Sequence, residues 1–407
     1  LADSELRHCV PEVASRVRHG AFLCAAELFD PSSFGISAAE SMAMDPQQRL
    51  LLERGYVALT RFGHSSRGSL LGSGAAVGIG QWASEFSGVL MSSAARCSVY
   101  AATGVQCSVT CGRVSFALGL HGPCASFDTA CSASLVACHV SLRALQRVES
   151  PTALSAGVNM LLDPVAMRGH AVAGFTSASG RSHTFDALAD GYSRAEAIGA
   201  IACELGSVVA LLPPAADLVG SAVRQDGRSA SLTAPNGQAQ QGVLTAAAGD
   251  AQLPSGSTAA LEAHGTGTAL GDPIEAGAMV AVLGRAEGSG ALAVGSLKAN
   301  TGHTEPGAGV AGLLSLCGML RSRTASPNAQ LRLLNPHVSI AVGVAGWCHL
   351  ATVASELTSG GCRNGGGGVS SFGYSGTIAH ALLTGSRDEG GGGLRALASR
   401  IGRLAFR

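Results

Sequence analysis

The most constraining feature of this 407-residue sequence is a segment that predicts a helix with apolar side chains on every face. Residues 126–128 have the pattern of a short strand, and the residues after them predict a helix from Cys131 to Arg147. The first three turns are apolar all round, from Leu135 to Leu142. Such a helix has no polar face to offer to water, so we expect it to be buried between other elements.

Length and composition indicate a large layered protein. The chain exceeds the ~250–300 residues at which a single core usually stops growing, so we expect two lobes or one layered domain of two halves. Only 13% of the residues are charged and 46% are hydrophobic, which indicates extensive buried surface and favours oligomerisation. Apolar runs that end in loops predict an α/β protein. The expected strands are 70–81, 199–212, 219–225, 259–263 and 291–295, and the expected helices are 47–56, 102–120, 237–247 and 313–320.

The charge pattern and the cysteines argue against several classes of protein. The formal net charge is zero and no block of like charges stands out, unlike in a nucleic-acid binder or a polybasic membrane patch. The most apolar stretch, 198–215, is interrupted by Glu204, Pro213 and Pro214, so we expect no membrane span. The twelve cysteines lack metal-site or disulfide spacing, which predicts free thiols in a reducing compartment and no structural metal.

The ends of the sequence suggest a segment of a longer polypeptide. It begins at Leu1 rather than Met and shows no signal peptide. Glycine-rich runs at 360–368 and 389–393, and the last twenty residues, have the composition of flexible linkers. None of them carries the residues of a phosphate-binding loop, so we expect no nucleotide site.

Cys131 stands at the first position of the predicted buried helix, directly after a run of small residues. The helix N-terminus would direct partial positive charge and free N–H groups at its sulfur, which predicts a thiol pKa below the usual value of about 8.5. The backbone N–H at this turn would also serve an oxyanion. A cysteine is more often a packed core residue, but the small-residue turn favours a nucleophile here.

Two histidines stand at similar strand-to-loop turns. His264 is followed by glycines and threonines at 265–268, which leaves room for a substrate to approach the backbone. His303 lies five residues after Lys298 and two before Glu305. Lys298 is the only lysine in the chain, which favours a functional ammonium at that place. We expect a buried pair of Lys298 and Glu305 to orient His303, the alternative being a solvated ion pair.

One cysteine and two histidines on separate turns suit the formation of a carbon–carbon bond from a thioester. A thiolate takes up the acyl group. Two imidazole N–H donors then stabilise the enolate and the oxyanion that form when a malonyl thioester loses CO₂. A cysteine protease would need only one histidine with a carboxamide.

At these three segments the chain resembles the ketosynthase (β-ketoacyl synthase) domains of type I and modular polyketide or fatty-acid synthases, which have the thiolase-like fold. Similar motifs run from Ala21 to Leu383, and their combination is specific to this family. They lie at 45–53, 112–116, 119–123, 184–186, 190–192, 225–228, 233–237 and 370–377.

The resemblance implies a five-layer α-β-α-β-α fold of two related halves, usually assembled as a homodimer. Residues 1–242 would form the half with the nucleophile, 243–385 the half with both histidines, and 386–407 a linker. The resemblance also implies that Cys131 receives an acyl group from the phosphopantetheine arm of an acyl carrier protein. Condensation with a malonyl-type extender would follow, with no cofactor bound by the domain itself.

The resemblance implies roles for further residues. Thr266 and Thr268 stand where the family contacts the pantetheine arm. Tyr374 stands at the gate residue of the loop 370–377, which also contains Phe372. The backbone N–H of this gate residue joins that of Cys131 in the family's oxyanion hole.

Three departures from the family pattern stand out. The family's opening strand is missing before Leu1, so we expect its sheet to be one strand short. Ala195 and Ala197 replace two glycines, which would be costly wherever a positive φ is required. Ile378 replaces an asparagine of the gating loop, and we expect it to loosen or reshape the gate. None of these changes touches Cys131 or either histidine.

An elongating ketosynthase is the leading interpretation, and two alternatives stay open. A non-elongating domain would only pass acyl chains between carriers, but such domains typically lack the second histidine, and His303 is present. An inactive dimerisation or scaffold domain would be compatible with the three departures. A degradative thiolase is disfavoured because that family has a second cysteine where His303 stands. The sequence does not distinguish a polyketide from a fatty-acid role.

Overall fold

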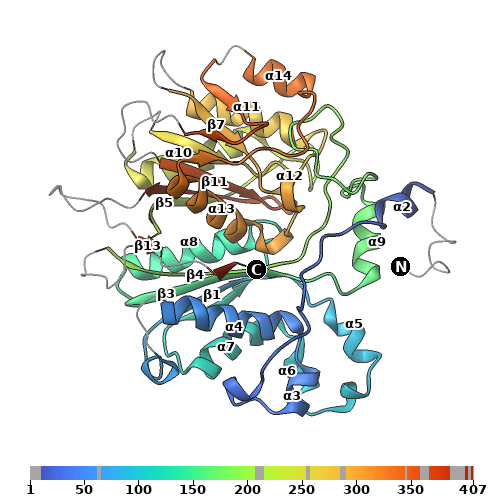
Figure 1. Ribbon diagram of the computed structural model, residues 1–407, viewed down its shortest axis with the longest axis vertical. Coiled ribbons are helices and arrows are strands. Elements are labelled where there is room, and N and C mark those ends of the chain that lie inside the picture. Colours follow the sequence, from blue (N-terminus) through green and yellow to red (C-terminus); the bar gives the residue numbers. More distant parts are fainter. Residues whose placement is uncertain are drawn as a thin grey trace.

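The chain folds into five stacked layers of helices and sheet, which follow one another from top to bottom in Figure 1. Two helices form the central layer, α8 (Ala133–Gln146) and α13 (Ala308–Ser322). The computed structural model describes residues 11–61, 66–206, 215–253, 257–284, 290–343, 346–357, 366–385, 399–401 and 405–406. The outer helices are α4 (Pro46–Arg61) and α7 (Cys107–Leu118) on one side and α10 (Gly237–Ala251), α11 (Gly271–Leu283) and α14 (Pro336–Val342) on the other.

The N-terminal half of the sheet lies between α8 and the helices α4 and α7. Its strand β1 (Ala76–Gly80) pairs in parallel with β2 (Cys124–Phe127) and with β3 (Thr152–Asn159). Strand β3 then pairs antiparallel with β4 (Ala197–Leu205). All residues of β1 and β4 except the last two of β4 are buried, as expected for strands covered by helices on both faces.

The C-terminal half of the sheet repeats this pairing pattern. Its strand β6 (Thr258–Glu262) pairs in parallel with β7 (Leu292–Gly295) and with β11 (Gly366–Phe372). Strand β11 pairs antiparallel with β12 (Thr377–Gly385), and β12 pairs antiparallel with β5 (Ala216–Gln225). The repeat supports the prediction of an α/β fold with two related halves.

Two short strands join the halves. Strand β13 (Ser399–Ile401) pairs antiparallel with both β4 and β5, and β14 (Ala405–Phe406) pairs with β4. They lie beside β4 in the position that β5 takes beside β12, and they satisfy backbone groups at the edge of β4. The linker predicted over 386–407 is therefore wrong at these strands. The predicted linker 360–368 likewise includes the start of β11, while 389–393 lies outside the described part. Because β13 occupies the edge beside β4, the sheet is not one strand short there, contrary to our expectation.

The central helices approach each other very closely. A Cβ atom placed at Gly309 would lie 2.6 Å from the Cβ of Leu135, so only glycine fits at this crossing. Leu135, Leu313 and Cys317 are almost completely buried around it. The burial predicted for the apolar helix is thus confirmed, although Val140 on its outer side is 42% exposed.

Most predicted elements are found within a few residues of their expected bounds. Helix α4 begins at Pro46, and the Asp45 carboxylate accepts the N–H of Gln47 at 2.8 Å as an N-terminal cap. The helix expected over 102–120 is divided into α6 (Ala101–Gly104) and α7, whose C-cap Gly119 has a positive φ of 71°. The strand expected over 70–81 is shorter, because a turn that includes Gly72 (φ 78°) occupies its first residues and β1 begins only at Ala76.

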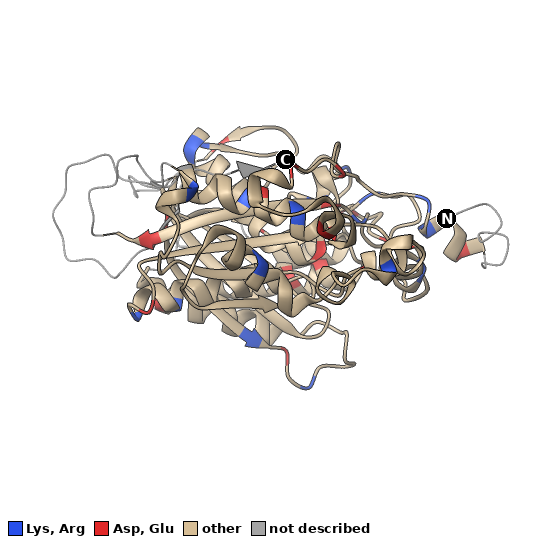
Figure 2. Ribbon diagram, turned by 90° about the horizontal axis from the view of Figure 1, so that it is seen from below, with Lys and Arg blue, Asp and Glu red and all other residues tan. Residues whose placement is uncertain are grey.

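Shorter elements complete the described chain. Lys and Arg positions (blue) and Asp and Glu positions (red) are interspersed along the ribbon in Figure 2. Within the described residues, no helix combines the length and the apolar character needed to cross a membrane. The remaining elements are α2 (Pro11–Arg16), η1 (Ser32–Phe34), α3 (Ala38–Ala43), η2 (Arg67–Ser69), α5 (Phe86–Met91), η3 (Ala94–Cys97), α6 (Ala101–Gly104), α9 (Pro164–Val172), α12 (Lys298–Thr301), η4 (Glu305–Gly307), β8 (Thr324–Ala325), β9 (Cys348–Leu350) and β10 (Ser355–Glu356).

Candidate active site

Cys131 lies in the tight connection between β2 and α8. Ala130, directly before it, has a positive φ of 54°, which is unusual for a residue with a side chain. Ser132 is the N-cap residue, and α8 begins at Ala133, two residues after the predicted start. The Ser371 hydroxyl donates to the Cys131 carbonyl at 2.6 Å and ties this turn to β11. Cys131 is only 5% exposed, so its sulfur is almost hidden from water.

The pKa of the Cys131 thiol is raised to about 12, chiefly by burial and then by the negative charge of Glu305. Lys298 and the backbone N–H groups of Cys131 and Tyr374 lower the pKa without cancelling that increase. The expectation of a lowered pKa is therefore wrong. Withdrawing the sulfur from water destabilises a thiolate more than the nearby N–H groups and cation stabilise it. The thiol is protonated at neutral pH in the free domain.

His303 is in direct contact with the nucleophile. Its Nε2 lies 3.0 Å from the Cys131 Sγ, and its Nδ1 accepts the backbone N–H of Glu305 at 3.1 Å. Burial lowers the pKa of His303 well below its usual range, and Lys298 lowers it further, so the ring is neutral. A neutral imidazole carries one proton, and a ring whose Nδ1 accepts a hydrogen bond carries that proton on Nε2. His303 therefore offers an N–H donor to the site.

His264 reaches the same place from β6. Its ring centroid lies 5.6 Å from that of His303, and the two rings are nearly perpendicular. Its Nδ1 accepts the backbone N–H of Phe372 at 3.3 Å, which again leaves the proton on Nε2. Glu275 on α11 anchors the loop by accepting the N–H groups of His264 and Gly265 at 2.7 and 2.8 Å. Burial lowers the pKa of His264 well below its usual range, so this ring is also neutral.

Glu305 has a different partner from the one we expected. The Arg194 guanidinium donates from Nε to Oε1 at 2.8 Å and from Nη2 to Oε2 at 2.9 Å. In the part of the chain that the structure describes, no ion pair joins Glu305 to Lys298. The attraction of Glu262 and Glu275 acts on Lys298 instead and opposes the lowering of its pKa by burial. A planar guanidinium matches a carboxylate at two points, which an ammonium cannot do.

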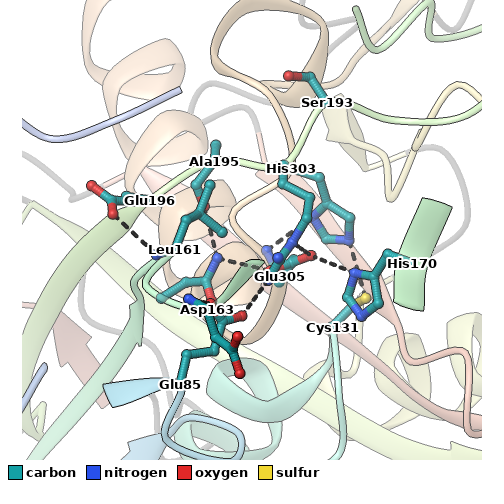
Figure 3. A network of polar contacts seen from close by, with 12 residues as sticks. Glu85, Cys131, Leu161, Asp163, His170, Ser193, Ala195, Glu196, His303 and Glu305 are labelled. Carbon is teal, nitrogen blue, oxygen red and sulfur yellow. Dashed lines mark hydrogen bonds and ion pairs between the residues drawn. The ribbon is translucent and has the colours of Figure 1, made fainter. Parts of the chain in front are cut away.

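A buried polar network surrounds this ion pair (Figure 3). Asn159 donates to the Glu305 Oε2 at 2.9 Å, and the His170 Nδ1 lies 3.3 Å from Oε1. The same Arg194 Nη2 also donates to Glu85 Oε1 at 2.7 Å. Glu305 was predicted from its place beside His303, and Arg194 belongs to the family motif that includes the two alanines. The other three come from separate elements and have no spacing that would connect them.

The reacting side chains face one cavity of about 430 Å³. Cys131, His264 and His303 line it, together with Thr266 and Thr268, whose hydroxyl oxygens are 3.3 Å apart. The structure thus brings the predicted nucleophile, both histidines and both predicted pantetheine-binding threonines to one space. Among the described residues, no group of three or more metal-ligating side chains is placed to hold a metal ion.

Phe372, at the end of β11, and Tyr374, in the turn between β11 and β12, line the cavity. The Phe372 ring packs against His264 with the ring centroids 5.4 Å apart, and the Tyr374 ring lies 5.5 Å from that of Phe175. Tyr374 is 41% exposed, so this predicted gate residue lies where the cavity meets solvent. Its backbone N–H also acts on the Cys131 sulfur, as an oxyanion donor at this turn would.

The departures from the family pattern leave the site intact. Neither Ala195 nor Ala197 is among the described residues with a positive φ, so neither needs to be glycine. Ile378 is fully buried in β12, where it is paired with Phe372 and packs in a cluster with Val243. It is absent from the residues that line the cavity, so its side chain belongs to the core rather than to the gate.

Comparison with known families matches both halves of the chain. The family model "Beta-ketoacyl synthase, N-terminal domain" matches residues 3–205, and "Beta-ketoacyl synthase, C-terminal domain" matches residues 215–332. The mycoketide-CoA synthase of Mycobacterium tuberculosis is 39% identical over 92% of this chain. The erythronolide synthase EryA2 of Saccharopolyspora erythraea is 38% identical over 90% of it. The chain spans about a tenth of each relative, 9% and 10% of their lengths.

Solved structures agree with these matches. The ketosynthase from module 6 of the bacillaene synthase of Bacillus subtilis 168 is 29% identical, with a TM-score of 0.79 over 89% of this chain and 62% of that one. An oxazolomycin ketosynthase domain of Streptomyces albus JA3453 is 30% identical, with a TM-score of 0.82 over 91% of this chain and 65% of that one. The chain therefore belongs to the β-ketoacyl synthase family, as a thiolase-like ketosynthase domain of the type I polyketide synthase kind. Members of this class are acyltransferase-type condensing enzymes.

Proposed function

We propose that this domain is an elongating ketosynthase, which loads an acyl chain onto Cys131 and extends it with a malonyl-type unit. The observation that carries the proposal is the meeting of one thiol and two imidazole Nε2–H donors in a single cavity. A domain that only transfers acyl groups needs the thiol and an oxyanion site. The second donor has a use when an enolate must be stabilised.

In the loading step, Cys131 attacks the carbonyl carbon of an acyl thioester on a pantetheine arm. The bond from the Cys131 sulfur to carbon forms as the bond from carbon to the pantetheine sulfur breaks. The proton of the Cys131 thiol ends on the departing pantetheine sulfur. The backbone N–H groups of Cys131 and Tyr374 lie close enough to the sulfur to lower its pKa, and we propose that they stabilise the oxyanion of the tetrahedral intermediate.

In the elongation step, a malonyl-type thioester loses CO₂ and its carbon–carboxylate bond supplies the electrons of an enolate. The Nε2–H groups of His264 and His303 would donate to the enolate oxygen. The enolate carbon then attacks the acyl carbonyl on Cys131 and forms the new carbon–carbon bond. The Cys131 sulfur leaves as a thiolate and takes a proton from water, which restores the free thiol.

The proposed substrates arrive on the phosphopantetheine arm of an acyl carrier protein. Thr266 and Thr268 place two hydroxyl groups beside the nucleophile, where they would bind the amide and hydroxyl groups of such an arm. The size of the relatives supports the proposal that the domain works within a longer multidomain synthase.

We also propose that the domain is a homodimer that pairs along β2. This strand ends the described sheet path, and an uncovered edge strand exposes backbone groups that pair readily with a second copy. Phe116 on the adjacent helix α7 is 87% exposed, which is unusual for a phenylalanine. Equilibrium sedimentation would test this, and a monomer at micromolar concentration would contradict it.

The elongation proposal is tested by intact-protein mass after incubation with acyl-thioester donors, followed by a malonyl-loaded carrier protein. We expect an acyl adduct on Cys131 that is discharged when the malonyl carrier is added, with release of CO₂ and a product two carbons longer. An adduct that never condenses would identify a non-elongating transacylase. The absence of an adduct from every donor would favour an inactive scaffold domain.

A further inference from the structure

The segment Ser193–Ala195 holds the backbone of His303 on both sides. The His303 N–H donates to the Ser193 carbonyl at 2.7 Å, and the Ala195 N–H donates to the His303 carbonyl at 2.9 Å. Arg194, between them, forms a parallel bridge with His303. The side chain of Arg194 therefore starts from a backbone that is fixed relative to the histidine.

That side chain is the largest fully buried one in the described structure, with 1% exposure. It bonds both oxygens of the Glu305 carboxylate and also Glu85, and its guanidinium lies 5.4 Å from the centroid of the Trp82 ring. Glu85 Oε2 in turn accepts the N–H groups of Leu162 and Asp163 at 2.8 and 2.9 Å. The guanidinium is thus held between two carboxylates, and only Glu305 belongs to the loop of the catalytic histidine.

Glu305 adopts a left-handed backbone conformation, with φ of 47°, which a residue with a side chain rarely takes without support. In this conformation its N–H donates to the His303 Nδ1 at 3.1 Å. The Glu305 carboxylate is held by Arg194, by Asn159 at 2.9 Å and by the adjacent His170. The strained residue that sets the protonation of His303 therefore depends on its buried anchors.

We propose that Arg194 is a positioning residue that keeps the proton of His303 on Nε2, acting through the carboxylate and the backbone N–H of Glu305. The proposal deepens the elongating function proposed above and rests on it. Without the two-point anchor, Glu305 relaxes towards an ordinary backbone conformation and its N–H leaves Nδ1. The proton of the ring is then free to move to Nδ1.

The two tautomers of His303 have different consequences for the two half-reactions. With the proton on Nδ1, Nε2 becomes an acceptor, which still suits the Cys131 thiol at 3.0 Å. The same ring then offers no donor to an enolate oxygen. Loss of the anchor should therefore impair decarboxylation far more than loading, whereas a general loss of structure would impair both equally.

The test is Arg194→Lys, which keeps the buried charge but removes the planar two-point contact. Arg143→Lys is the matched control, since Arg143 bonds both oxygens of Asp250 at 3.0 and 2.7 Å, away from the cavity. Loading of Cys131 is followed by mass spectrometry, and CO₂ release from a malonyl thioester is followed separately. We expect Arg194→Lys to slow decarboxylation about 10- to 100-fold, somewhat less than the ~10²–10³-fold cost of deleting a donor outright. Loading should change less than about threefold, and Arg143→Lys should leave both rates unchanged.

A second readout separates this inference from the proposed function. In protein labelled with ¹⁵N-histidine, the His303 signals are assigned by their loss in His303→Gln. They should show the proton on Nε2 in the wild type and a fraction moved to Nδ1 in Arg194→Lys. A wild type that never releases CO₂ would overturn the elongating function but leave this measurement valid. Protonation on Nδ1 in the wild type, or equal slowing of both half-reactions in the variant, would overturn the role of Arg194. If Arg194→Lys does not fold, a wild-type spectrum with the proton on Nδ1 would still overturn the proposal. Glu305→Gln is then measured in place of Arg194→Lys.

Discussion

In the N-terminal half, β2 leads through a tight turn into α8 and places Cys131 at the start of that helix. In the C-terminal half, β7 leads through α12 towards α13 and places His303 just before it. The two strands hold equivalent positions in the repeated sheet pattern, and the two helices face each other in the central layer. One position of the repeated architecture thus supplies a nucleophile in one half and a hydrogen-bond donor in the other. The comparison shows that the fold fixes where a side chain meets the cavity, while the residue type decides its role.

The largest effect should come from removing the nucleophile of the N-terminal half. Cys131→Ala should form no acyl adduct, and condensation should fall by about 10⁴-fold or more, because no other described thiol lines the cavity. Intact mass after incubation with acyl thioesters measures this. Cys138→Ala is the control, since that buried thiol lies within the core on α8, the helix that follows Cys131. Persistence of the adduct in Cys131→Ala would place the nucleophile elsewhere.

Removing a donor of the C-terminal half should separate the two half-reactions. His264→Ala should slow CO₂ release by about 10²–10³-fold, the usual cost of losing one oxyanion donor. Loading should change little, because His303 rather than His264 lies 3.0 Å from the sulfur. Exposed His337 on α14 provides the control substitution His337→Ala. If His264→Ala lost loading and CO₂ release to the same extent, the assignment of separate roles to the two halves would be wrong.

The pH dependence of Cys131 alkylation tests whether burial or the helix N-terminus governs the thiol. Only the thiolate reacts with iodoacetamide, and a pKa of about 12 means that the thiolate fraction is small at neutral pH. The fraction rises as the pH rises towards 12, so the rate should climb about tenfold per pH unit between pH 7 and 10 without a plateau. Labelling is quantified on the peptide that contains Cys131, because Cys24, Cys97 and Cys124 are exposed and react first. A plateau near pH 8 would show that the helix N-terminus prevails.

The smallest effect concerns a departure from the family pattern in the segment that supports His303. Ala195→Gly should destabilise the domain by about 0.5–1 kcal/mol, since Ala195 does not need a positive φ and glycine adds freedom to the unfolded chain. Urea unfolding measures the change, with Ala197→Gly in β4 as the comparison. A stabilised Ala195→Gly variant would mean that the alanine is strained.

The site could be predicted from sequence wherever one short segment carries its own signal. Cys131, His264 and His303 each stand in a turn whose small residues and apolar approach distinguish it from ordinary loops. The Arg194–Glu305 pair could not be derived in this way, because its members are 111 positions apart and nothing local distinguishes Arg194 from Lys298 as a partner. The pKa of Cys131 depends on how deeply the turn is buried, which only the packed layers determine. The strands β13 and β14 were missed because they have no apolar pattern and are defined by pairing with β4 and β5.

Gly309 lies at the crossing of α8 and α13, and its lack of a side chain is what allows the two helices to pack there. The helix that follows Cys131 and the helix that follows His303 are in contact where Gly309 meets Leu135. The two helices can approach this closely because Gly309 has only a hydrogen atom in place of a side chain. Other contacts between the halves involve side chains that can change rotamer, whereas this one brings helix against helix. At this contact a larger residue on one helix demands a smaller one on its neighbour. In related chains, positions 135 and 309 should therefore change together or not at all.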